Sequence, residues 1–183
     1  VIYATQTKIE GQCGSVMDIN EDIGFGLGFG YNINDYLNVS CLVGWNSRSY
    51  ATTATLNNGN PYKYNNTMDT TTTSLNATYY VLSSNLTPFI SGTVGYTWVD
   101  SNIPNGAPAG ACWYDPIYGY VCAETYPTKV QSAINYGGGL GVRYDINNAV
   151  GLQADWNRVW VNMNNVDGTP HFDTWRLDFI LRF

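Results

Sequence analysis

Residues 22–31 read DIGFGLGFGY, and this stretch decides the fold class of the chain. Large apolar residues and glycine alternate along it, the apolar ones being Ile23, Phe25, Leu27, Phe29 and Tyr31. Successive side chains of a β-strand point to opposite faces, so the segment predicts a strand with one bulky face and one bare face. Such a strand suits the wall of a narrow barrel, with glycine toward the interior and the bulky side chains toward lipid.

The same alternation recurs in six more segments, at residues 37–46, 75–81, 90–98, 134–144, 150–157 and 174–183. An eighth strand over residues 1–9 is needed for an even count, although that segment alternates poorly. Strong helix formers are scarce, and Thr, Tyr, Val, Asn and Gly favour strands and turns. The sequence therefore predicts an all-β chain, a single domain over residues 1–183 that forms an eight-stranded antiparallel up-and-down barrel.

The connections between these segments alternate between short and long. Short ones lie at residues 32–35, 82–86 and 145–148, and longer ones at 10–21, 52–69, 100–129 and 162–171. This alternation places tight turns at one end of the molecule and loops at the other. Outer-membrane barrels have that asymmetry, with short periplasmic turns and long extracellular loops.

Aromatic residues gather near both ends of the predicted strands. Tyr31, Tyr36, Tyr80, Tyr144 and Phe183 lie beside the short turns, and Trp45, Trp98, Trp156, Trp160 and Trp175 lie toward the loops. Two aromatic girdles about one bilayer apart are typical of membrane barrels. A soluble sandwich or lipocalin-like barrel is the alternative, because periodicity alone does not say which face points inward.

Composition excludes several other classes of protein. Only 12% of the 183 residues are charged and the net charge is −6, so no basic stripe is available for nucleic acid. Aromatic residues make up 15% of the chain, which excludes a disordered chain. No stretch reaches the 18 or more apolar residues of a transmembrane helix.

The four cysteines are Cys13, Cys41, Cys112 and Cys122, and they allow three pairings. Cys112 and Cys122 bracket a segment rich in Pro, Gly and Tyr, which favours a disulfide between them within a loop. That bond would imply an oxidising compartment, such as the periplasm or the cell exterior. Four reduced thiols remain the alternative.

The final residues, FDTWRLDFILRF, resemble the C-terminal signal of bacterial outer-membrane proteins, carried here by Trp175, Leu177, Phe179, Leu181 and Phe183. The resemblance implies that the barrel-assembly machinery docks on this strand during insertion. The whole chain resembles the small OmpA-, OmpX- and OmpW-like barrels, in segments such as GGGLGVRYDINNAVGLQADW. It implies a Gram-negative outer membrane, contact with lipid and lipopolysaccharide, and none of the function of the peptidoglycan-binding domain of OmpA.

The alternation turns five charged residues toward the lumen, namely Arg143, Asp155, Arg176, Asp178 and Arg182. If the last two strands pair through the 162–171 loop, we expect Asp155 roughly opposite Asp178, with Arg176 on the diagonal. Two carboxylates that close need a cation between them. These residues predict an ion-pair network that plugs the lumen, and a gated pore is the alternative. Arg158 alternates onto the lipid face, where it could reach lipopolysaccharide phosphates, unless a bulge turns it inward.

Tyrosine and tryptophan are frequent in the long loops, including Trp113, Tyr114, Tyr118 and Tyr120. Such rings bury much area at low entropic cost, so they suit contact with a partner or with a second copy. The only histidine, His171, has no evident catalytic partners, and we expect no enzyme activity, cofactor or metal. We expect a structural or surface-interaction role, with a narrow channel for small or apolar solutes as the alternative.

Overall fold

The computed structural model describes residues 1–10, 15–55, 61–82, 84–107, 109–162 and 169–182, and these contain twelve strands and no helix. No helix among these residues is long and apolar enough to cross a membrane. The strands are β1 (Ile2–Ala4), β2 (Thr7–Glu10), β3 (Val16–Ile19), β4 (Asp22–Asn32), β5 (Leu37–Thr55), β6 (Pro61–Tyr80), β7 (Leu86–Pro104), β8 (Ala109–Asp115), β9 (Gly119–Thr125), β10 (Thr128–Asp145), β11 (Val150–Val161) and β12 (His171–Leu181).

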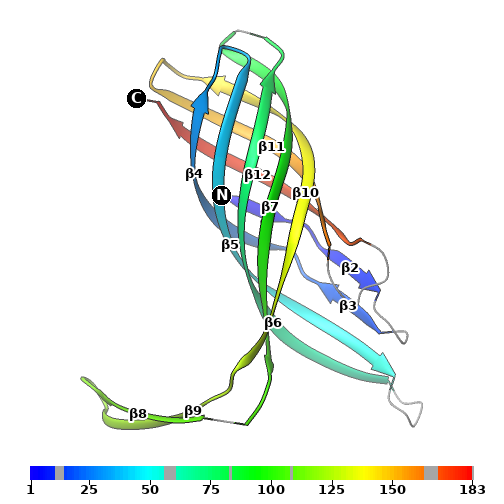
Figure 1. Ribbon diagram of the computed structural model, residues 1–183, viewed down its shortest axis with the longest axis vertical. Helices are drawn as coiled ribbons and strands as arrows, with labels where there is room; N and C mark the ends of the chain where they lie inside the picture. The colour runs from blue at the N-terminus through cyan, green and yellow to red at the C-terminus, as the bar shows by residue number, and fades with distance from the viewer. Residues whose placement is uncertain (11–14, 56–60, 83, 108, 163–168, 183) are drawn as a thin grey trace.

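Eight of these strands close into an antiparallel barrel in the order β1, β4, β5, β6, β7, β10, β11 and β12 (Figure 1). Strand β1 completes the ring, since Ile2–Ala4 pairs with β4 on one side and with β12 on the other. A membrane interior offers backbone groups no water, and only a closed sheet satisfies them from within. The all-β, eight-stranded barrel predicted from the alternation is confirmed.

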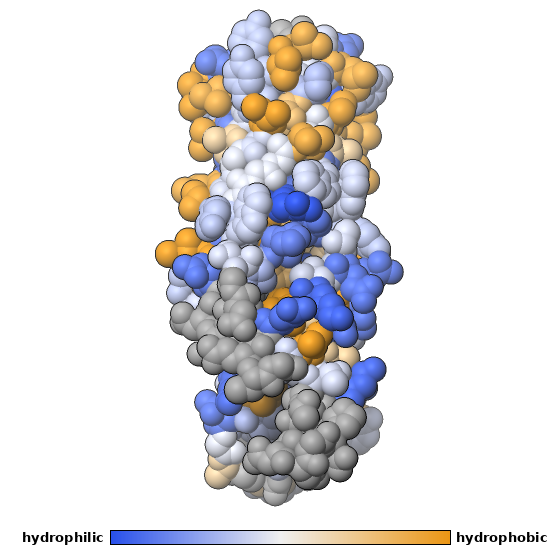
Figure 2. Space-filling model, turned by 90° about the vertical axis from the view of Figure 1, so that its right-hand side faces the viewer, coloured by the Kyte–Doolittle hydropathy of each residue, from blue (hydrophilic) through white to orange (hydrophobic). Residues whose placement is uncertain are grey.

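The outer face of the barrel is apolar over the half that carries the short turns. Figure 2 shows hydrophobic side chains gathered at that end and hydrophilic ones toward the other. On β4 the large side chains of Phe25, Leu27, Phe29 and Tyr31 are 66–87% exposed. The alternation therefore has the sign predicted for a membrane barrel.

Tyr80 is an exception to the predicted girdle beside the short turns. It is only 4% exposed and points into the lumen, where its ring meets that of Phe89 edge-on at 5.9 Å between centroids. Its neighbour Tyr79, at 50% exposed, faces outward in its place. The predicted girdle residue was therefore wrong by one position. A shift of one residue along a strand moves the side chain to the opposite face.

Two of the short turns use the same device. The Asn34 side-chain oxygen accepts hydrogen bonds from the backbone N–H of Tyr36 and of Leu37, both at 2.8 Å. Asn147 does the same for the N–H groups two and three residues further on. An asparagine side chain that substitutes for backbone in this way fixes a tight turn, and so sets the register of the hairpin around it.

The long connections predicted as loops contain strand in three of the four cases. Strands β5 and β6 pair continuously from Leu37 with Tyr79 to Thr55 with Pro61, far past the apolar belt. The predicted loops at 10–21 and 100–129 contain β3 and the hairpin of β8 and β9 (Figure 1). Beyond the membrane no lipid contact forces the outer face of a strand to be apolar, so no apolar–polar alternation marks these extensions in the sequence.

The predicted first strand over residues 1–9 is broken into β1 and β2. Ala4 and Ile9 both face the interior, at 0% and 8% exposed, whereas a regular strand would put residues five apart on opposite faces. Between them Thr5 donates from its backbone N–H to the carbonyl of Asp173 at 3.0 Å. This change of parity explains why the segment alternates poorly.

One glycine in the wall tests how tightly the turn-side lumen is packed. A Cβ on Gly141 would lie 2.5 Å from the Asp155 Cβ and 2.6 Å from the Phe89 Cζ, whereas one on Gly92 would meet nothing within 4 Å. We expect Gly141→Ala to lower the free energy of unfolding by about 1–3 kcal/mol, as overpacking of a filled core does. Urea titration in lipid vesicles, read by heat-modifiable gel mobility, measures it. Gly92→Ala is the matched control, and equal midpoints for the two variants would contradict the prediction.

Candidate functional site

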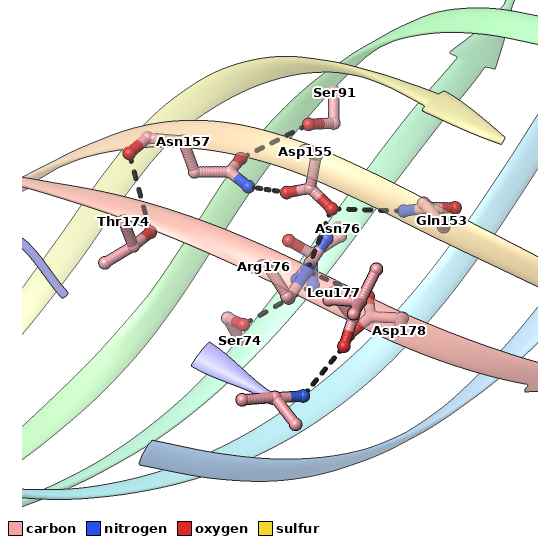
Figure 3. Close-up of polar contacts among 11 residues, drawn as sticks. Ser74, Asn76, Ser91, Gln153, Asp155, Asn157, Thr174, Arg176, Leu177 and Asp178 are labelled. Carbon is pink, nitrogen blue, oxygen red and sulfur yellow. Dashed lines mark hydrogen bonds and ion pairs between the residues drawn. The ribbon is translucent and has the colours of Figure 1, made fainter. Parts of the chain in front are cut away.

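The turn-side half of the lumen holds a first ion-pair cluster on β11 and β12. Arg176 Nε lies 3.1 Å from an Asp155 oxygen and 2.9 Å from an Asp178 oxygen (Figure 3). The Asp155 side chain is fully buried, and Gln153 and Asn157 on the same strand also donate hydrogen bonds to it. Both oxygens of this buried carboxylate therefore have hydrogen-bond donors inside the barrel.

A second cluster lies nearer the short turns and joins β10 to the end of the chain. Arg143 Nη2 lies 3.2 Å from an Asp145 oxygen, and Arg182 pairs with the other oxygen of that carboxylate. The Arg143 guanidinium also lies 3.8 Å from the centre of the Tyr80 ring. Asp145 was not among the predicted lumen residues, because the sequence placed it at the start of a turn.

The five predicted lumen charges thus fall into two clusters, and their register differs from the one expected. Asp155 lies directly opposite Arg176, and Asp178 lies opposite Gln153. The expectation that Asp155 faces Asp178 was wrong by two residues, because the length of the connection between β11 and β12 does not fix their pairing. The direct pairing puts a cation against the most deeply buried carboxylate.

The loop-side half of the lumen contains a cavity of about 800 Å³, which we call the lumen cavity. It extends from the rim near Asn105 and Lys129 down to Asn76, Thr93 and Arg176. An apolar ring of side chains near its opening, here called the mouth cluster, comprises Ile9, Ile19, Tyr50 and Met68, with Met17, Val99 and Phe172 packed against them. The alternation predicted a lumen plugged by ion pairs, with a gated pore as the alternative, and gave no sign of this cavity.

Arg48 is the functional candidate that the sequence analysis missed. It lies on β5, is 8% exposed and lines the lumen cavity. The guanidinium lies 5.6 Å from the centre of the Phe172 ring in the mouth cluster. Continuing the alternation of β5 by three residues past Trp45 would have placed Arg48 inside the barrel.

On the outer wall, Arg158 forms a bidentate ion pair with Asp173, with both N–O distances at 2.8 Å. Its guanidinium also lies 5.3 Å from the centre of the Trp156 ring, and the Arg158 side chain is 39% exposed. The side chain is therefore on the outer face and not in the lumen. Contact with lipopolysaccharide stays a prediction.

The hairpin of β8 and β9 carries the predicted disulfide. Cys112 and Cys122 face each other in the register of the two strands and are bonded, which confirms that expectation. Tyr114, Tyr118 and Tyr120 are 74–82% exposed on this hairpin. The side chain of Trp113 lies outside the described part of the chain, as does Cys13, and Cys41 is a free, exposed cysteine.

The predicted C-terminal signal presents a regular outward row on β12. Its described members Trp175, Leu177, Phe179 and Leu181 are 55–65% exposed, and Phe183 lies outside the described residues. The docking of the assembly machinery on this row stays a prediction. His171 begins β12, and no group of three or more potential metal ligands gathers among the residues described.

The stability of the first cluster depends on Arg176. Replacement by Met leaves the buried Asp155 without its cation, so we expect the barrel to lose about 3–5 kcal/mol of stability. Urea unfolding in lipid vesicles measures the loss. Arg158→Met, which breaks a more exposed pair on the same hairpin, is the control and should cost clearly less. Equal losses in the two variants would contradict the assignment of a buried, structural cluster.

The geometry agrees with comparisons to known proteins. A family model described as outer membrane protein beta-barrel domain matches residues 3–183. The crystal structure of Neisserial surface protein A (NspA) is 14% identical, with a TM-score of 0.56, and the match covers 99% of this chain and 94% of that one. The outer membrane protein OprG from Pseudomonas aeruginosa is 13% identical, with a TM-score of 0.52 and coverages of 98% and 91%.

At these identities the likeness to both structures concerns the fold. A sequence comparison with curated proteins found no match. The family model covers nearly the whole chain, and the barrel has the apolar belt that the family requires. The chain therefore belongs to the outer membrane protein beta-barrel domain family and is an integral outer-membrane protein.

Proposed function

We propose that the barrel admits small, largely apolar molecules from the cell exterior into the loop-side half of its lumen. The observation that carries this proposal is the lumen cavity, whose volume of about 800 Å³ lies in the range of small-molecule sites. The prediction from the sequence was a surface role, with a solute channel as the alternative. The cavity is the reason to place it first.

The walls of the cavity support binding of an apolar body. The mouth cluster offers Ile, Met and Phe side chains, and threonine hydroxyls such as those of Thr72 and Thr97 lie deeper. An apolar molecule that leaves water for such a site gains free energy in proportion to the area it buries. The two ion-pair clusters occupy the lumen further toward the turns, which favours capture over free flow of ions.

A surface-interaction role is the second candidate, and the hairpin of β8 and β9 favours it. The two strands form a sheet of their own that projects from the barrel (Figure 1). A lone two-stranded hairpin is marginally stable in water, so its disulfide holds a shape that packing does not supply. Rigid, exposed tyrosines at Tyr114 and Tyr120 are suited to contact with a protein surface.

Filling the cavity tests the first candidate. In lipid nanodiscs we expect radiolabelled 1-octanol to bind the wild-type protein saturably, above the partitioning into empty discs. Thr93→Trp places a large ring in the cavity and should weaken this binding about tenfold or more. Val94→Trp adds the same ring one residue away on the lipid face and should leave binding unchanged. Binding no greater than that of empty discs would refute the proposal.

Removing the disulfide tests whether the hairpin is held rigid. We expect the double variant Cys112→Ser/Cys122→Ser to be cut faster by chymotrypsin after the exposed tyrosines of the hairpin, because the strands then separate more often. The urea midpoint of the barrel should not change, since the hairpin pairs with no barrel strand among the described residues. Equal cleavage rates would show that the disulfide does not order the hairpin.

A further inference from the structure

Arg48 enters the lumen cavity without a counter-ion. None of the five ion pairs among the described residues includes it. Its Nε donates a hydrogen bond to the Asn46 side-chain oxygen at 2.7 Å, and its Nη1 is buried with no hydrogen-bond partner within the described structure. A buried cationic donor left unpaired costs free energy, so the protein retains Arg48 at a cost to its own stability.

Asn46 supplies a second unsatisfied donor beside the first. Its oxygen is engaged by Arg48, and its Nδ2 is buried with no partner among the described residues. The two residues are two apart on β5, so both side chains lie on the same face, and both line the lumen cavity. Two adjacent donors without acceptors, one of them charged, call for a ligand that brings an anionic acceptor.

The surroundings of Arg48 restrict the charge of such a ligand. The nearby walls belong to the mouth cluster, including Phe172 beneath the guanidinium. Asp22 attracts Arg48 electrostatically from β4, yet no ion pair joins them, and one Asp22 oxygen accepts a hydrogen bond from the Ile23 N–H at 2.7 Å. One guanidinium in an apolar wall, with a carboxylate at some distance, balances one negative charge and disfavours two.

We propose that Arg48 and Asn46 bind the carboxylate of an amphipathic monocarboxylate, whose apolar body lies in the lumen cavity against the mouth cluster. This rests on the proposed uptake of small molecules and names their class. The planar guanidinium presents donors in the fork that a carboxylate accepts, and the Asn46 amide adds a further donor at its side. The cavity extends from this head-group site both along the mouth cluster and down toward Thr93, which leaves room for the body.

A matched pair of ligands tests the proposal on the whole chain. Octanoate and 1-octanol share one apolar body and differ in the head group, and equilibrium dialysis against nanodiscs of zwitterionic lipid measures both at neutral pH. We expect wild-type protein to bind octanoate about 10- to 100-fold more tightly than octanol, the range of a charge-assisted hydrogen bond. Arg48→Met should abolish the preference, so that the variant binds the two ligands with similar affinity.

Lys8→Met is the control for charge, because it removes one positive charge from the same end of the barrel on an exposed side chain. It should leave the octanoate preference intact. Urea unfolding checks that the variant is folded. Arg48→Met should unfold at the wild-type urea concentration or above it, since the lost charge had no ion-pair partner. Octanoate should then stabilise the wild-type protein and not the variant.

The outcomes separate this inference from the function on which it rests. Equal binding of both ligands, unaffected by Arg48→Met, would overturn the carboxylate site and leave uptake of apolar molecules standing. Saturable binding of octanoate alone would support the carboxylate site and overturn uptake of neutral apolar molecules. If neither ligand binds above empty nanodiscs, both proposals fail.

Discussion

The pairing of backbone groups inside hydrocarbon is the constraint on which this structure depends. Lipid offers the N–H and C=O groups no partner, so the wall has to close, and closure between β4 and β12 rests on three residues of β1 on each side. Once the wall is closed, the side chains of each regular strand alternate between the lipid and the lumen. A charge on the lumen side is costly without a partner, and Arg176 supplies one for Asp155 from the neighbouring strand.

The two halves of the lumen differ because their side chains differ in size. On the turn side the lumen is filled by the side chains of Phe89, Tyr80 and the arginines. On the loop side the inward positions of β6 and β7 hold threonine and serine, and the strands continue past the membrane. An eight-stranded barrel can enclose a cavity only where its inward residues are small.

The fold could be predicted from the sequence wherever one face of a strand meets lipid, as in DIGFGLGFGY, because that contact forces the alternation. The strand extensions at residues 52–55 and 61–69 were not predicted, since no lipid contact forces a regular apolar–polar alternation there. The candidate site could be predicted only in part. The inward parity of Arg143 and Arg182 could be read from the alternation, but the pairing of Asp155 with Arg176 depends on a register that the sequence leaves open. Arg48 lay past the end of the apolar pattern.

The last hairpin has a property that bears on membrane insertion. Strand β11 brings Asp155 and Arg158, and β12 brings Arg176 and Asp173, so each charge of β11 has an opposite charge across the hairpin. Asp178 shares Arg176 from the same strand. Inserted singly, each strand would carry unpaired charges into hydrocarbon, at a cost of several kcal/mol each. Inserted together, the two strands bring each charge of β11 next to an opposite charge of β12. The order of assembly with the lowest barrier therefore delivers β11 and β12 as one preformed unit.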